Sequence, residues 1–347
     1  MLNNILNCNI NPKIGIKNLG HTSYLNAVLQ CFKNIYTIAN YFLKNNNSSI
    51  DKDSESLSNE IRKIFYYFIQ DENHHDKEPY NPENIFKILS NIYTIKNYES
   101  YDPNEFLNFL LDRLHKEYHE EEKLNLNKKK KNNEEEEINK REKCIMDGIN
   151  RLKHSIISDN FTILKLKELI CSNCKNINYE FKSFNSYDLD ITNCHKKLNN
   201  NLKITECLNN EETKSEKFCE NCNGKFLFKI INRIYSSSEI FVFLLDRKQM
   251  DEEYIKIPFV IDEKIDLNNF IEDTHSPKNY ELNGIVSISM REKKYVAFSK
   301  SPIDKKWYLY NDSEVQPVIF KFILESHNHY FNFYTPCILF YELVKND

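Results

Sequence analysis

The chain has 347 residues, of which 40% are hydrophobic, and its 21 tyrosines and 23 phenylalanines argue against a disordered protein. A net charge of −4 supplies no basic surface to neutralise phosphates, so we expect no nucleic-acid partner. The sequence shows neither a membrane-length apolar run nor a secretory signal, so we expect no membrane partner and a cytoplasmic or nuclear location.

Residues 1–117 are predicted to form a helical lobe, because apolar residues recur there at intervals of three and four. These residues fall into three groups: Leu25, Val28, Leu29 and Phe32; Ile61, Ile64 and Phe65; and Leu107, Leu110, Leu111 and Leu114. Residues 118–143 are almost entirely charged residues and asparagine, which cannot bury a core face. We therefore expect them to form a disordered, solvated insertion.

From residue 155 to the end, the pattern changes to short runs rich in isoleucine, valine, phenylalanine and tyrosine, separated by polar turns. Such runs predict strands, and the lack of alternating helical segments favours a largely antiparallel sheet. Helices followed by strands indicate an α+β fold. We expect a single domain over residues 1–347.

Ser23 lies where the loop that starts at Gly15 is predicted to run into the first helix. Serine is a preferred N-cap residue. One interpretation is therefore that Thr22 and Ser23 only cap the helix. The segment alone leaves open whether Thr22 and Ser23 do more than cap the helix.

Asp102 begins a second motif, Asp-Pro-Asn-Glu-Phe-Leu, that continues into a leucine-rich helix. Asp102 as the cap, Pro103 at the first helical position and Glu105 three residues after the cap resemble a capping box. These residues are therefore expected to start a helix, whatever else they do.

Two Cys-x-x-Cys pairs, at residues 171–174 and 219–222, supply the four thiolates of a closed tetrahedral site, so we expect structural Zn²⁺. The gap between the pairs exceeds that of a compact zinc ribbon, which places each pair on its own hairpin. Redox dithiols are the alternative, but a redox pair is usually single and lies beside a βαβ unit. The expected ligands are Cys171, Cys174, Cys219 and Cys222.

The C-terminal part contains Lys294-Tyr-Val-Ala-Phe, Trp307-Tyr-Leu-Tyr-Asn-Asp and a final Cys-Ile-Leu-Phe-Tyr-Glu-Leu run. With the Ser23, Asp102 and cysteine motifs, these segments resemble the ubiquitin-specific protease family along nearly the whole chain. The resemblance implies a papain-like hand with a helical thumb (1–117), an antiparallel palm and zinc-tipped fingers (both within 155–347).

The resemblance also implies roles for individual residues. Ser23 takes the nucleophile position, Asn18 the oxyanion position, Lys294 the histidine position and Asn311 the third triad position. Asp102 and Glu105 correspond to the acidic residues that meet the basic C-terminal tail of ubiquitin. The implied partners are thus ubiquitin or a ubiquitin-like protein, with a larger protein complex as a further possibility.

The family uses cysteine and histidine where this chain has Ser23 and Lys294. A serine hydroxyl needs a base with a pKa near the working pH, and a lysine with a pKa near 10.4 suits that role poorly. Our main hypothesis is a catalytically inactive ubiquitin-binding protein. The alternatives are an active deubiquitinase and a scaffold in a splicing or chromatin complex that does not bind ubiquitin. His275, His327 and His329 fall outside the motif and are expected to be surface or turn residues.

Overall fold

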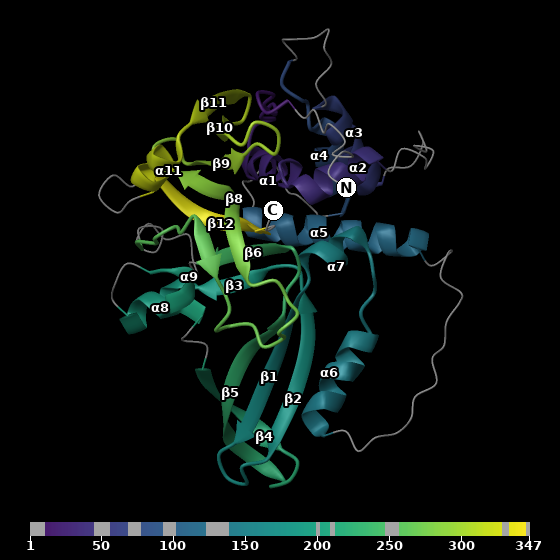
Figure 1. The fold of residues 1–347 in the computed structure, drawn as a ribbon, viewed down its shortest axis with the longest axis vertical. Coiled ribbons are helices and arrows are strands. Elements are labelled where there is room, and N and C mark those ends of the chain that lie inside the picture. Colours follow the sequence, from purple (N-terminus) through teal and green to yellow (C-terminus); the bar gives the residue numbers. More distant parts are fainter. Residues whose placement is uncertain are drawn as a thin grey trace.

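The computed structural model describes residues 11–44, 56–68, 78–92, 102–122, 139–198, 202–208, 212–246, 257–327 and 333–344. A helical lobe covers one side of an eight-stranded sheet, and a long four-stranded sheet extends away from both (Figure 1). This arrangement confirms the predicted α+β fold. No helix in the described ranges is both long and apolar enough to cross a membrane.

The helical lobe is held together by the three predicted groups of apolar residues, all of which are buried. Phe42 and Phe65 stack at 4.9 Å between ring centroids, and Phe32 packs beside them. The helices of the lobe are α1 (Ser23–Lys33), α2 (Tyr36–Lys44), α3 (Leu57–Tyr67), α4 (Glu83–Ile92), α5 (Pro103–Glu122) and α7 (Ile156–Phe161).

The eight-stranded sheet, here called the palm sheet, separates two hydrophobic cores. Its members are β3 (Tyr187–Asp190), β6 (Ile240–Asp246), β7 (Lys264–Asp266), β8 (Asn279–Ser289), β9 (Lys294–Lys300), β10 (Trp307–Asn311), β11 (Glu314–Val318) and β12 (Tyr334–Leu343). The order is β11-β10-β9-β8-β12-β6-β3, with β7 beside β8, and β3–β6 is a parallel pair among otherwise antiparallel neighbours.

Alternation along β9 explains how one sheet serves both cores. Tyr295 and Ala297 face the helical lobe, whereas Val296 and Phe298 face the second core. The helices on the second side are α8 (Ile191–Leu198), α9 (Ile204–Leu208) and α11 (Phe320–Ser326). Helix α1 therefore packs directly on the face of β9 that carries Tyr295.

The four-stranded sheet, here called the finger sheet, consists of β1 (Ile163–Cys171), β2 (Ile177–Phe184), β4 (Glu212–Cys219) and β5 (Gly224–Ser236). All of its pairs are antiparallel, in the order β2-β1-β5-β4. Helix α6 (Lys140–Asn150) lies along β2 (Figure 1). A Cβ atom on Gly148 would lie 2.0 Å from Phe181 Cδ1, so glycine is what allows this close approach.

Both ends of the predicted insertion 118–143 are helical. Helix α5 continues to Glu122, because buried Tyr118 packs against Tyr41 and Phe42 and extends the apolar face of the helix. Helix α6 begins at Lys140, with the Asn139 side chain accepting a hydrogen bond from Glu142 N as its cap. The prediction of disorder for 118–122 and 140–143 was therefore wrong, and residues 123–138 lie outside the described part.

Candidate active-site cleft and cysteine cluster

Ser23 is the first residue of α1 and lies at the contact between α1 and β9. Its hydroxyl accepts a hydrogen bond from the Tyr295 amide at 3.2 Å, and the residue is 4% exposed. Thr22 occupies the N-cap position but makes no side-chain cap hydrogen bond. Neither residue caps the helix through its side chain, so the simple capping interpretation fails.

Asn18 shapes the loop before Ser23. Its side-chain oxygen accepts hydrogen bonds from Gly20 N at 2.9 Å and Thr22 N at 3.3 Å, and Gly20 has a φ of 118°, a conformation that favours glycine. Its amide nitrogen donates to Asp312 Oδ2 at 2.9 Å. Asn18 thus holds the loop that leads to Ser23, with one of its two N–H donors committed to Asp312.

Asp312, predicted only as a neighbour of Asn311, is the centre of the polar network around the start of α1. Its buried carboxylate accepts hydrogen bonds from Asn18 and from Asn26 Nδ2 at 2.8 Å. Its backbone has a φ of 56° in the turn between β10 and β11, a conformation that aspartate tolerates better than most residues. Its carbonyl accepts Ile16 N at 2.9 Å, which ties the turn to the loop before α1.

Lys294 forms two ion pairs instead of contacting Ser23. Its Nζ lies 2.9 Å from Glu292 Oε2 and 3.4 Å from Asp312 Oδ2. Partial burial alone would lower the pKa of Lys294, but the hydrogen bond that Lys294 donates to Glu292 and the charge of Asp312 outweigh it and raise the pKa above its usual value. The same contact lowers the pKa of Glu292 despite some burial. Glu292 and Asp312 therefore favour the protonated form of Lys294.

Asn311, at the third triad position, ends β10 next to Asp312. Its Nδ2 donates to Glu292 Oε2 at 3.4 Å. Its Oδ1 is buried without a hydrogen-bond partner in the described part of the chain. The Asn311 side chain thus contacts Glu292, which is also the ion-pair partner of Lys294, and keeps one buried acceptor.

Asp102 starts α5 as predicted, because its Oδ1 accepts Asn104 N at 2.8 Å and its carbonyl accepts Phe106 N. Burial raises the pKa of Asp102, and the nearby charges of Glu105 and Asp246 add to the effect. Asp102 in turn contributes to the raised pKa of Tyr295, after burial and Cys337. Asp102 therefore lies near Tyr295, whose backbone N–H contacts Ser23, whereas Glu105 is exposed on the first turn of α5.

His327 does not provide an alternative base for Ser23. It is 6% exposed and not the surface residue that the sequence analysis expected, because Ser287 Oγ and Ile323 O bind its two ring nitrogens at 2.7 Å. Burial lowers the pKa of His327 to about 4. Its ring packs on Phe298, on the side of the palm sheet opposite α1.

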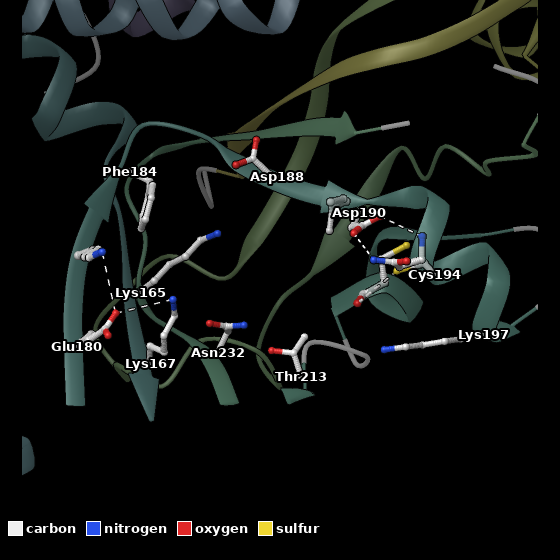
Figure 2. Close-up of a pocket in the computed structure, with 14 residues that line it drawn as sticks. Lys165, Lys167, Glu180, Phe184, Asp188, Asp190, Cys194, Lys197, Thr213 and Asn232 are labelled. Carbon is white, nitrogen blue, oxygen red and sulfur yellow. Dashed lines mark hydrogen bonds and ion pairs between the residues drawn. The ribbon is translucent and has the colours of Figure 1, made fainter. Parts of the chain in front are cut away.

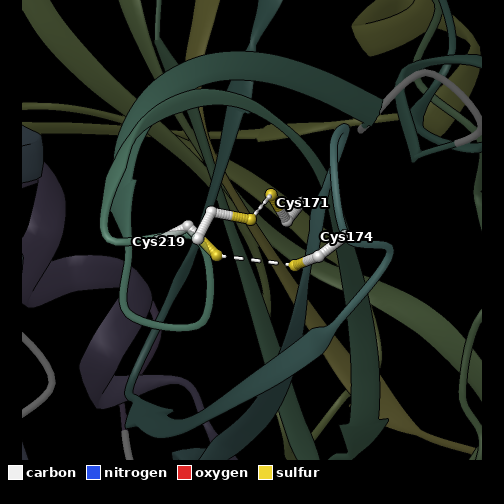
Figure 3. Close-up of side chains that lie close together, drawn as sticks. Cys171, Cys174 and Cys219 are labelled. Carbon is white, nitrogen blue, oxygen red and sulfur yellow. Dashed lines mark hydrogen bonds between the residues drawn. The ribbon is translucent and has the colours of Figure 1, made fainter.

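The four predicted cysteine ligands meet at the tip of the finger sheet (Figure 3). All four sulfurs lie within 4.8 Å of one another, with Cys171 Sγ to Cys222 Sγ at 4.0 Å and Cys174 Sγ to Cys219 Sγ at 3.6 Å. A tetrahedron with Zn–S bonds near 2.3 Å has S–S edges of about 3.8 Å. The cluster therefore matches a tetrahedral metal site.

The surroundings of the cluster favour a thiolate at Cys171, whereas, against the opposing Asn176 N–H, the neighbouring thiols raise the pKa of Cys174, and burial raises the pKa of Cys219 to about 12. Burial alone would raise the pKa of the Cys171 thiol, but the N–H groups of Cys174 and Asn173 donate to its sulfur and lower the pKa to about 7. Asn173 Nδ2 also donates to Cys222 Sγ at 3.3 Å. Because the clustered sulfurs oppose one another's ionisation, a bound cation would stabilise their thiolate forms together.

The fold and the cleft together define a papain-like hand, in which a helix N-terminus faces a palm sheet and a cysteine-tipped finger sheet extends from it. A family model described as ubiquitin carboxyl-terminal hydrolase matches residues 14–341. The chain therefore belongs to the ubiquitin carboxyl-terminal hydrolase family.

Curated relatives agree with this assignment. The chain is 25% identical over 340 residues to Ubiquitin carboxyl-terminal hydrolase Usp2 of Drosophila melanogaster, covering 92% of this chain and 34% of that protein. It is 22% identical over 380 residues to Ubiquitin carboxyl-terminal hydrolase 4 of Saccharomyces cerevisiae, covering 94% and 40%. The chain thus spans about two fifths or less of the length of these relatives.

Solved structures share the fold. One is the SAGA DUB module of Ubp8, Sgf11, Sus1 and Sgf73 bound to monoubiquitin, with a TM-score of 0.68 and 19% identity over 99% of this chain and 71% of that chain. A similar module bound to ubiquitin aldehyde also has a TM-score of 0.68, with 18% identity over 99% and 72%.

Proposed function

We propose that this protein binds ubiquitin or a ubiquitin-like protein and does not hydrolyse the bond at its C-terminus. The observation that carries the proposal is the double ion pair of Lys294 with Glu292 and Asp312. A lysine held between two carboxylates stays protonated and cannot take a proton from Ser23. Without a base, the Ser23 hydroxyl remains a poor nucleophile.

The acidic residues at the start of α5 and at the end of β6 support the binding of a basic tail. Asp102, Glu105 and Asp246 place negative charge near the Ser23 end of the cleft, where a basic C-terminal tail would be attracted. Two structures with the same fold hold monoubiquitin or ubiquitin aldehyde. We assign Asp102 and Glu105 to tail binding, and we place Asn18 and Asn311 at the oxyanion and third triad positions of the inactive site.

We further propose that the cysteine cluster holds structural Zn²⁺. Four sulfur ligands without an open position suit a structural site, not a catalytic one. The metal would fix the two hairpins of the finger sheet to each other, because Cys171 and Cys174 lie on one and Cys219 and Cys222 on the other.

The catalytic part of the proposal is tested by restoring the family residues. Ser23→Cys with Lys294→His is expected to release a fluorophore from the C-terminal amide of ubiquitin, because Asn311 Oδ1 can accept the new imidazole N–H. Ser23→Ala with Lys294→His is the matched control and should stay inactive. If the restored variant binds ubiquitin but remains inactive, the two substitutions do not explain the loss of turnover.

The binding part is tested by titrating fluorescent monoubiquitin with the wild-type protein. Saturable binding in about the micromolar range supports the proposal. A scaffold that has lost ubiquitin contact would give no saturable signal. Membership of a larger complex, and a cytoplasmic or nuclear location, stay proposals that rest on the resemblance to the SAGA module.

A further inference from the structure

Two cysteines outside the cluster at the finger tip meet in the segment that joins β3 to β4. Cys194 lies on α8 and Cys207 lies on α9, 13 positions later in the chain. The Cys194 thiol donates to the Cys207 carbonyl at 4.0 Å, and the Cys207 side chain hydrogen-bonds the Cys194 side chain. Both side chains are thiols in the structure. The fold thus brings two reduced sulfurs into contact, which is what formation of a disulfide requires.

Each of the two helices is held in place by its own contacts. At the start of α8, Asp190 accepts hydrogen bonds from the backbone and side-chain amides of Asn193. Just before α9, Leu202 N donates to Pro258 O at 3.3 Å, and Leu202 O accepts Val260 N at 2.7 Å. The two cysteines themselves belong to the second core of the palm sheet. The contact between the sulfurs is therefore built into the fold.

A cavity of about 360 Å³ gives small molecules a route to both cysteines (Figure 2). Cys194 and Cys207 both line this cavity, which lies where the base of the finger sheet meets β3 and α8. Figure 2 shows Cys194 beside Asp190. A water-sized molecule takes up about 30 Å³, so a small neutral oxidant such as hydrogen peroxide fits into the cavity.

The two thiols differ in how readily they lose a proton. The pKa of Cys207 is raised well above its usual range, first by the hydrogen bond with Cys194, then by burial and by the charge of Cys194. Cys194 is therefore the first of the pair to ionise, and the S–H group of Cys207 donates to its thiolate. Cys194 is also the more exposed, at 7% against 2%. Because a thiolate is the form that attacks an oxidant, Cys194 is the attacking sulfur and Cys207 the resolving one.

We propose that Cys194 and Cys207 form a peroxide-sensitive thiol pair that closes to a disulfide and ties α8 to α9. The Cys194 thiolate attacks one oxygen of hydrogen peroxide and the O–O bond breaks. The departing hydroxide takes up the proton that left Cys194, which gives one water and a sulfenic acid. The Cys207 sulfur then attacks the sulfenic sulfur, the S–O bond breaks, and the Cys207 proton leaves in a second water. The two thiols lose two electrons in total, and a dithiol reductant restores them.

This thiol pair is independent of the proposed ubiquitin-like partner. Its disulfide would close the loop between α8 and α9, in the connection that runs from β3 of the palm sheet to β4 of the finger sheet. A closed loop restricts the unfolded chain, so the oxidised protein should unfold at a higher temperature than the reduced protein. In a reducing compartment such a disulfide forms transiently, which suits a reversible sensor.

The test treats the full-length protein with hydrogen peroxide in the presence of dimedone, which captures sulfenic acids. Tryptic peptides are then analysed by mass spectrometry, because trypsin cleaves at the lysines between the two cysteines and puts them on separate peptides. Wild type is compared with Cys194→Ser and Cys207→Ser. Cys144→Ser, at a partly exposed cysteine of α6, is the matched control. Thermal unfolding before treatment establishes that all four proteins are folded.

We expect wild type and Cys144→Ser to yield the two peptides linked through Cys194 and Cys207, with a combined mass lower by two hydrogen atoms, and dithiothreitol to separate them. Cys207→Ser should carry dimedone on Cys194, whereas Cys194→Ser should keep Cys207 as a thiol. A wild type without the linked pair, or dimedone on Cys207 in Cys194→Ser, overturns the proposal. Linkage that appears only after the protein has unfolded also overturns it.

Discussion

Replacing Lys33 with methionine should stabilise this protein, because the lysine is buried in an apolar environment. Lys33 ends α1 and is 1% exposed, and its Nζ has no hydrogen-bond partner among the described residues. The nitrogen lies 4.1 Å from the Phe68 ring centroid and 4.9 Å from the Tyr310 ring centroid. Burial lowers the pKa of Lys33 to about 7, an effect that the charge of Cys31 only partly opposes.

The magnitude follows from the difference in pKa between the folded and the unfolded chain. Lowering the pKa of Lys33 from about 10.5 to about 7 corresponds to a penalty of roughly 5 kcal/mol in the free energy of unfolding. This penalty applies in full below pH 7, where both the folded and the unfolded chain are protonated. Between about pH 7 and 10.5 the unfolded chain binds a proton that the folded chain does not, so stability rises with pH. Contacts between the ammonium and the two rings reduce the penalty by about 1–2 kcal/mol.

The assay is urea unfolding of wild type and Lys33→Met at pH 6, 8 and 9.5. We expect the methionine variant to be more stable by roughly 3–4 kcal/mol at pH 6, with the gap shrinking steadily towards pH 9.5. Lys44→Met, at an exposed position on α2, is the control and should show no such trend. A gap that does not change with pH, or a destabilised Lys33→Met, would refute the reasoning.

Three further predictions concern the metal, the α6 contact and the cleft. Purified protein should contain about one zinc per chain. The double variant Cys171→Ser with Cys219→Ser should lose both the metal and thermal stability, whereas the control Cys144→Ser should keep both. Equal thermal stability of the two variants, with and without chelator, would count against a structural metal. Gly148→Ala gains about 1 kcal/mol of helix propensity but should lose roughly 1–3 kcal/mol from the clash with Phe181. The substitution should therefore destabilise the wild-type protein and stabilise a Phe181→Ala variant. A change in stability of the same sign in both proteins would be inconsistent with the clash. Asp312→Asn should lower the pKa of the Lys294 ammonium towards its usual value in ¹⁵N NMR titrations, and an unchanged titration would mean that the ion pair does not form in solution.

The secondary structure of this fold was largely predictable from local patterns. Apolar spacing located α1, α3 and α5, and short β-branched and aromatic runs located most of the strands. Helix α6 was missed because its sequence is mainly polar and its packing depends on one glycine, Gly148, against Phe181. Such a contact carries no periodic signal in the sequence.

The cleft was predictable as a set of positions but not as a network. The motifs placed Asn18, Ser23 and Lys294 together, and the structure brings them to the contact between α1 and the palm sheet. The central role of Asp312 depends on contacts with residues almost three hundred positions earlier in the chain. Local sequence cannot reveal such contacts.

The burial of Lys33 and His327 was also hidden from the sequence. Lys33 is the last residue of α1, and His327 directly follows α11. Tertiary packing decides that both side chains are buried. Charge alone would place each at the surface. The buried positions are known only once the palm sheet and its two cores are assembled.

The central claim, that Ser23 is not a working nucleophile, is tested most directly by release of a fluorophore from the C-terminal amide of ubiquitin. Wild type and Ser23→Ala are measured side by side at protein concentrations high enough to detect slow turnover. We expect both proteins to give the same background rate. Turnover by wild type that Ser23→Ala abolishes would contradict the claim and make this protein a serine-based deubiquitinase.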